Sequence, residues 1–76
     1  MNTAQTHKPT LTDTEWSALF AATRSQRATT WNTTPTGTLQ AIRTQMIAVH
    51  GRNSNDPTVA GSFVALADIL SRRNAL

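Results

Sequence analysis

Large apolar residues recur three and four positions apart in three stretches of the 76-residue chain, which is the spacing of a helical face turned toward a core. The expected faces consist of Trp16, Leu19 and Phe20 with Thr23, then Leu39, Ile42, Met46 and Val49, and last Val59, Phe63, Leu66 and Leu70. No stretch alternates apolar and polar residues as a half-buried strand does. The chain is therefore predicted to be all-α, a compact three-helix domain with helices over roughly 12–26, 36–50 and 57–73.

The first of these helices has the clearest start signal in the chain. Thr12 followed by Glu15 three positions later forms the pattern of a capping box, in which side chains and backbone N–H groups at a helix start bond reciprocally. Continuing the helix would bring the charged Arg27 onto its apolar face, so we expect the helix or its packing to end near residue 26. Residues 28–38 are then a connection, with Trp31 folded back onto the core.

The other helix ends carry glycine and proline signals. At the start of the middle helix, Pro35 suits the first helical position after Thr34 as cap, with Thr36 or Thr38 as the alternative caps. Gly51 suits the left-handed position that follows its end. Asp56 and Pro57 form a cap and a first helical residue for the last helix.

The chain has four carboxylates, and helix formation accounts for all of them. Asp13 and Glu15 fall in the first turn of a helix, where negative charge is favoured. Asp56 is a helix cap. Asp68 lies four residues before Arg72, the spacing of an ion pair within one helix. No carboxylate is then left over for catalysis.

Metal and cofactor chemistry lack their usual residues. The chain has no cysteine, and its two histidines are His7 and His50. Zinc sites draw three or four ligands from Cys, His and carboxylate side chains. We therefore predict no catalytic residue, no metal, no cofactor and no enzymatic activity.

Small residues are spaced four apart in two of the expected helices. Gly61 and Ala65 form one pair and Ala18 and Ala22 the other. Small residues let two helix backbones approach closely, and we interpret them as internal packing, with a dimer contact as the alternative. Gly61 is expected on the face opposite the main apolar stripe of its helix.

The apolar arc of the helix over 57–73 is wide, because Ala60, Val64 and Ala67 flank its main stripe. Such an arc suits the central helix of a monomer, or a helix that also buries surface against a second subunit. A homodimer formed through this helix is therefore a further hypothesis.

The positive net charge of the chain is compatible with nucleic acid as a partner. The net charge is +3, from six arginines and one lysine against the four acids, but the cations are scattered. Two features count against a helix-turn-helix motif. The link from residue 50 to residue 57 is longer than the turn of that motif, and the last helix is too apolar to contact bases. Gln40 and Arg43 on the middle helix are base-reading residue types. A small, basic DNA-binding transcriptional regulator, as a monomer or a dimer, is therefore the alternative hypothesis.

A protein-docking surface is the preferred hypothesis. Arginine beside aliphatic and aromatic residues is typical of interface centres, and Ile47 belongs either to such a centre or to the core. The predicted partner-binding residues are Arg24, Arg27, Gln40, Arg43, Ile47 and His50. The chain is thus predicted to be a small binding protein that docks onto a larger protein and modulates or inhibits it. Short chains of this kind are common among phage, plasmid and bacterial regulators.

Domain organisation and location follow from the same composition. Residues 1–9 are polar and are expected to be a flexible lead to one domain over 10–76. No apolar run is long enough to span a bilayer, and the lead lacks the apolar segment of a secretory signal. A cytoplasmic protein without a membrane partner is expected.

Overall fold

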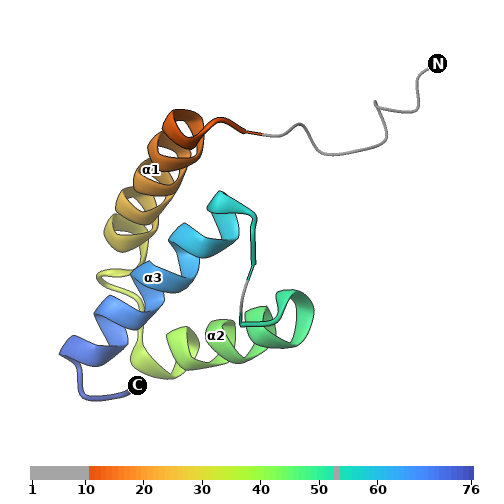
Figure 1. Ribbon diagram of the computed structural model, residues 1–76. Coiled ribbons are helices and arrows are strands. Elements are labelled where there is room, and N and C mark those ends of the chain that lie inside the picture. The colour runs from red at the N-terminus through yellow and green to blue at the C-terminus, as the bar shows by residue number, and fades with distance from the viewer. Residues whose placement is uncertain (1–10, 53) are drawn as a thin grey trace.

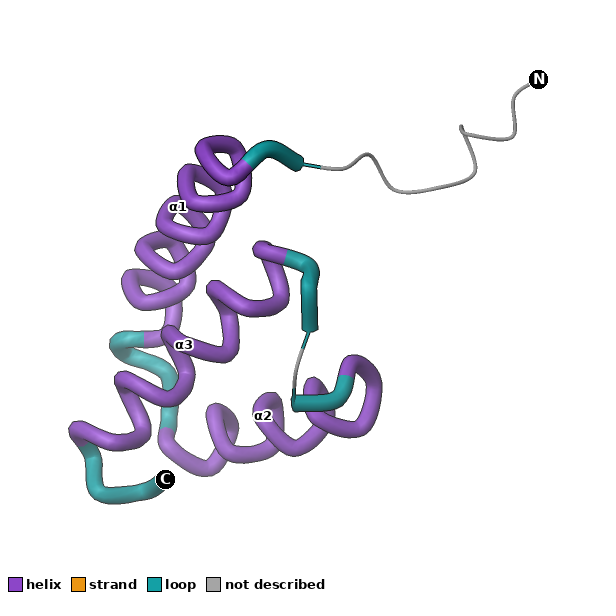
Figure 2. The backbone as a smooth tube through the Cα atoms, viewed as in Figure 1, coloured by secondary structure: helices purple, strands orange, loops and turns teal. Residues whose placement is uncertain are grey.

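The computed structural model describes residues 11–52 and 54–76, which form three helices joined by short connections (Figure 1). The helices are α1 (Asp13–Trp31), α2 (Thr36–His50) and α3 (Pro57–Arg72). The described residues contain no strand, as the tube in Figure 2 also shows. The predicted all-α, three-helix class is confirmed. The expected flexible lead lies outside the described residues.

The start of α1 has the predicted capping box. The Glu15 N–H donates to the Thr12 hydroxyl at 3.1 Å, and the Thr12 N–H donates to a Glu15 carboxylate oxygen at 3.0 Å. The pKa of the exposed Glu15 carboxyl is lowered by its hydrogen bonds with Thr12. The bond from the Thr12 backbone N–H has the largest effect, and the bond with the Thr12 hydroxyl has the second largest.

The end of α1 differs from the prediction, because the helix continues to Trp31 instead of stopping near residue 26. The guanidinium carbon of Arg27 lies 5.7 Å from the centre of the Trp31 ring. An aromatic face attracts a cation, so a charged residue on this side of the helix is accommodated. Trp31 packs against the core as the last residue of the helix and not from a loop.

The contact between α1 and α3 depends on small residues of α3. Gly61 and Ala65 are both buried. A Cβ atom added to Gly61 would lie 2.8 Å from the carbonyl oxygen of Phe20 and 3.1 Å from the backbone nitrogen of Arg24. The prediction that Gly61 faces away from the core is therefore wrong. Internal packing is confirmed for the Gly61 and Ala65 pair, whereas Ala18 and Ala22 are exposed.

The core lies where α2 meets the C-terminal half of α3. Its fully buried side chains are Leu39, Leu66, Ile69 and Leu70. Trp31, Ile42, Met46 and Ala75 pack around them. Since α2 packs chiefly against α3 and not against α1, a narrow stripe of α2 is enough to reach the core.

Two large residues of the expected apolar faces are exposed to solvent. Val49 of α2 is 67% exposed and Leu19 of α1 is 42% exposed. Their assignment to the buried faces is wrong, because each expected stripe is wider than the surface that its neighbouring helix covers.

The remaining helix ends follow local signals, with one exception. Gly51 ends α2 with a φ of 74°, which favours glycine. The Asp56 carboxylate caps α3 by accepting from the Thr58 N–H at 2.9 Å, and Pro57 follows as the first helical residue. Pro35 precedes α2 as its N-cap and is not the first helical residue as expected.

Arg73 fastens the C-terminal end of α3 to the connection between α1 and α2. Its guanidinium donates to the carbonyl oxygens of Thr34 at 2.7 Å and Asn32 at 2.9 Å, and to the Thr36 hydroxyl at 3.1 Å. At the opposite end, the Trp16 indole N–H donates to the Asn55 carbonyl at 3.3 Å. These bonds join segments that are distant in the sequence.

Candidate functional site

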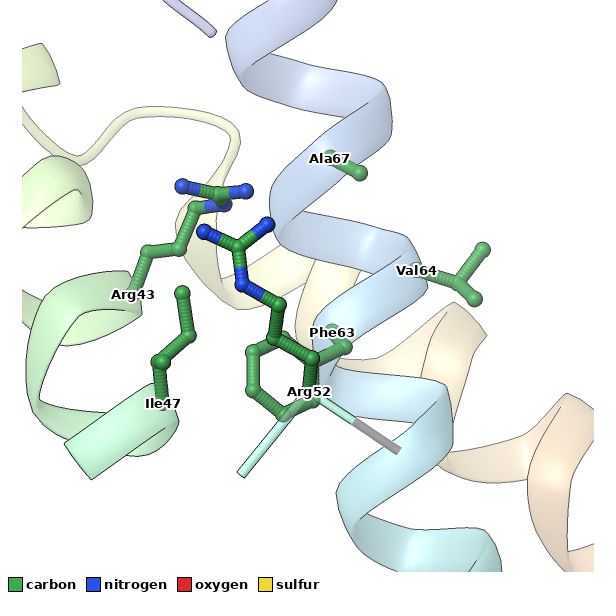
Figure 3. Close-up of a pocket in the computed structure, with 6 residues that line it drawn as sticks. All are labelled: Arg43, Ile47, Arg52, Phe63, Val64 and Ala67. Atoms are coloured by element: carbon green, nitrogen blue, oxygen red, sulfur yellow. The ribbon is translucent and has the colours of Figure 1, made fainter. Parts of the chain in front are cut away.

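A groove of about 240 Å³ lies between α2 and α3 on the side where the connection between them begins (Figure 3). Its walls come from three segments of the chain. The residues that line it are Arg43 and Ile47 of α2, Arg52 of the connection, and Phe63, Val64 and Ala67 of α3. The groove therefore combines two cations with four apolar side chains.

Helix geometry brings these side chains together. Arg43 and Ile47 are four residues apart and share one face of α2. Phe63 and Ala67 have the same spacing on α3. The left-handed turn at Gly51 redirects the chain, so that Arg52 lines the groove beside α2.

The apolar part of the groove is only partly covered. Phe63, Val64, Ala67 and Ile47 are all half-buried, and none belongs to the fully buried core cluster. Ile47 thus lies on the wall of the groove, between the core and the surface. The groove offers apolar surface that the described residues do not cover.

The two arginines of the groove have no carboxylate partner in the part of the chain that the structure describes. Within the described residues neither Arg43 nor Arg52 forms an ion pair, and their guanidinium groups lie toward the same side of the groove (Figure 3). The carboxylates are used elsewhere: Asp13 and Glu15 at the start of α1, Asp56 at the cap of α3, and Asp68 in a pair with Arg24. The groove therefore carries positive charge that no acid of the described residues neutralises.

The ion pair of Asp68 joins two helices, not two turns of one helix. Its carboxylate lies 2.7 Å from the guanidinium of Arg24 on α1, whereas Arg72 donates from its Nε to the backbone carbonyl of Asp68. The predicted pair with Arg72 is therefore wrong. Both charged side chains of the observed pair are about half exposed, at 50% and 43%, so its expected contribution to stability is at most about 1 kcal/mol.

The predicted partner-binding residues are only partly brought together. Arg43 and Ile47 line the groove. Arg24 is paired with Asp68, Arg27 stacks on Trp31, and Gln40 donates to the Ala75 carbonyl at 3.0 Å. His50 is exposed in the last turn of α2 and is not among the residues that line the groove.

Four residues of the groove are absent from the predicted set. Arg52 lies in the connection after α2, and Phe63 was expected on the apolar face of its helix. Val64 and Ala67 gave the usable signal, because the apolar arc of their helix is wider than a helix packed on one side requires. An apolar flank such as Val64 and Ala67, next to another helix that carries an arginine such as Arg43, indicates a partly uncovered groove.

The groove offers guanidinium hydrogen-bond donors beside apolar side chains. Within residues 11–52 and 54–76, no group of three or more His, Cys, Asp or Glu side chains has the arrangement of a metal site. The volume of about 240 Å³ also lies below the roughly 300–1,000 Å³ of small-molecule sites.

No protein-family model matches the chain, and comparisons with curated proteins and with solved structures found no match. None of the described helices combines the length and apolarity that a bilayer crossing requires. Inference about function therefore starts from the groove itself.

Proposed function

We propose that this chain is a small, non-enzymatic binding protein that docks onto a larger protein through the groove between α2 and α3 and modulates or inhibits it. The observation that carries the proposal is the pair of arginines, Arg43 and Arg52, which form no ion pair within the described residues and lie beside half-buried apolar side chains. Arginine next to an apolar centre is the composition of protein interfaces.

The rest of the molecule supports a role by stoichiometric binding. The acids cap helices or form the pair between Arg24 and Asp68, so the chemistry available at the surface is recognition. The helices also hold the two sides of the groove in place, through the core below it and through the bonds of Arg73 at the end of α3. A preformed surface lowers the entropy lost on binding.

The test compares partner capture by the wild-type protein and by Arg43→Glu, using lysate of the source cells with and without nuclease. We expect the substitution to abolish capture of a nuclease-resistant protein partner while helicity and thermal unfolding stay unchanged. The matched control is the double variant Gln26→Glu with Gln45→Glu, which changes net charge by the same amount at exposed positions outside the groove. Capture that survives Arg43→Glu excludes the groove as the docking site.

Nucleic acid is the second candidate, favoured by the same two arginines on a chain of net charge +3. Two contacts weigh against α2 as a base-reading helix: Gln40 is bonded to Ala75, and Arg43 is half-buried toward α3. Affinity for DNA should fall by about 0.9 decades per neutralised phosphate per decade of salt. An apolar protein interface should respond far less to salt, so a salt series separates the two candidates.

A homodimer through α3 remains a third proposal, and the fold restricts where it forms. One side of α3 is covered by α1 and another by α2, so the uncovered part of its apolar arc is the groove. A dimer of this kind therefore competes with docking onto another protein. Light scattering over a range of concentrations tests it, and a strict monomer at high concentration excludes it.

A further inference from the structure

We infer that the occupant of the groove is an acidic amphipathic helix of the partner protein, which sets a carboxylate against Arg43 and Arg52 and an aliphatic or aromatic side chain against Phe63. This inference rests on the proposed docking function and names the chemistry of the partner. Three features of the groove carry it: its charge, its apolar lining and its helical walls.

Charge complementarity requires an anion from the partner. Arg43 and Arg52 converge on one groove without an acid partner among the described residues, and two neighbouring cations repel each other. A guanidinium fork matches the planar geometry of a carboxylate and binds it through two parallel hydrogen bonds. Because Arg43 is half-buried, such a bond is less screened than one on an open surface.

The apolar lining requires an apolar side chain beside that anion. Phe63 and Ile47 face the same space as the two arginines. A free anion or a phosphate would leave this surface wet. A Glu or Asp with a Leu, Met or Phe three or four positions away on a helix presents both groups on one face. The volume of about 240 Å³ suits an anchoring side chain rather than a whole small molecule.

The walls of the groove favour a helix over other peptide conformations. Strand addition needs an exposed sheet edge, and residues 11–52 and 54–76 contain no strand. Recognition of a polyproline helix uses a groove lined by several aromatic rings, whereas Phe63 is the one aromatic residue that lines this groove. A helix laid into a groove between two helices is the remaining common mode, with anchors spaced three and four residues apart.

The experiment selects ligands from a displayed library of randomised helical peptides, using the full-length protein as bait. The double variant Arg43→Glu with Arg52→Glu serves for counter-selection, after its wild-type helicity and unfolding have been verified. We expect enriched peptides to carry Asp or Glu three or four positions from Leu, Ile, Met or Phe. Enrichment of neutral or basic peptides, or of none, overturns the inference.

Charge reversal then tests the contact directly. For an enriched peptide labelled with a fluorophore, the double variant should weaken binding by about thirtyfold or more, measured by anisotropy. A peptide with its acid replaced by lysine should recover much of that loss on the double variant and bind wild type poorly. The Gln26→Glu with Gln45→Glu control is compared with the single variant Arg43→Glu, which changes net charge by the same amount, and should change affinity by less than about threefold, since exposed distant charges are screened. Equal weakening by this control shows a long-range charge effect and overturns the direct contact.

The outcomes separate the two proposals. Peptide binding that does not depend on Arg43 and Arg52 overturns the inferred chemistry but leaves a protein-docking role elsewhere on the surface. A labelled DNA duplex or a phosphopeptide that binds through the two arginines more tightly than any acidic helix overturns the inference in favour of phosphate. If nuclease treatment also abolishes capture of the partner from lysate, the proposed protein-docking function is overturned as well.

Discussion

The two faces of α3 meet their neighbours in opposite ways. Toward α1, Gly61 has no side chain, and the backbones of the two helices approach until an added Cβ atom would lie 2.8 Å from the Phe20 carbonyl oxygen. Toward the C-terminal half of α2, Phe63 and Ile47 remain half-buried beside two arginines that have no ion-pair partner among residues 11–52 and 54–76. The first contact resembles a protein interior and stabilises the fold. The second leaves surface and charge available to a partner.

The largest expected contrast is between a core residue and a groove residue of α3. Leu66→Ala removes a fully buried side chain and should cost about 3 kcal/mol of unfolding free energy. Phe63→Ala removes a half-buried ring and should cost about 1 kcal/mol. Urea unfolding followed by circular dichroism measures both. If Leu66→Ala does not fold, Leu66→Met should still fold at a cost below about 1.5 kcal/mol. Equal losses for the two alanine variants contradict the contrast.

The close approach of α1 and α3 is tested at the glycines. Gly61→Ala places a methyl group 2.8 Å from a backbone oxygen and should destabilise by about 1–2 kcal/mol, despite the better helix propensity of alanine. Gly37→Ala is the matched control, because no atom lies within 4 Å of an added Cβ there, and it should be neutral or stabilising by about 0.5 kcal/mol. The same unfolding assay decides. Two variants of equal stability would show that the α1 and α3 backbones are free to separate.

Substitutions of two neighbouring arginines test whether Arg73 holds the end of α3 against the connection between α1 and α2. Arg73→Gln removes a half-buried guanidinium with three hydrogen bonds to the connection between α1 and α2, and should cost about 1–2 kcal/mol. Arg72→Gln removes an exposed side chain whose one bond stays within α3, and should cost less than about 0.5 kcal/mol. Thermal unfolding of both variants measures the difference. A larger loss from Arg72→Gln would contradict the assigned role of Arg73.

The smallest effect is expected at the start of α1, far from both faces of α3. Thr12→Ala breaks the capping box and should cost about 1 kcal/mol or less, whereas Thr14→Ala at an exposed position of the same turn should be neutral. The pKa of Glu15 is lowered in the folded protein, so its stabilising contribution is present above the unfolded pKa and is lost as the pH falls through the folded value. A carboxyl NMR titration should show the Glu15 pKa rising part of the way toward its ordinary value in Thr12→Ala, because the hydroxyl is lost while the backbone N–H of residue 12 remains. An unchanged pKa would mean that the Thr12 hydroxyl does not contribute to the shift.

Local signals predicted where the helices begin. The bonds of the capping box at Thr12 span three residues, and the Asp56 cap spans two, so both are satisfied within a stretch that the sequence displays directly. The end of α1 was harder to predict, because the contact of Arg27 with Trp31 depends on the rotation of two side chains. The charge of Arg27 on an apolar face predicted that the helix would end there. Because Trp31 lies four positions further on and accommodates that charge, the helix continues.

The candidate site was predicted only in part. Arg43 and Ile47 share a helical face, and that spacing is visible in the chain. Arg52, Phe63 and the two flanking residues of α3 join them only because α3 packs beside α2 at one particular rotation about its axis. No spacing rule reports which side of a wide apolar arc a neighbouring helix will leave uncovered.

By itself, the sequence determined the helical class and the capped starts of α1 and α3. The tertiary structure decided which charges meet and which stay apart. Asp68 pairs with Arg24, 44 positions away, instead of with Arg72 on its own helix. Gly61 is buried against α1 instead of facing outward. The physical reason is that caps form within a few bonds of the backbone, whereas partners across helices depend on how whole helices rotate and pack.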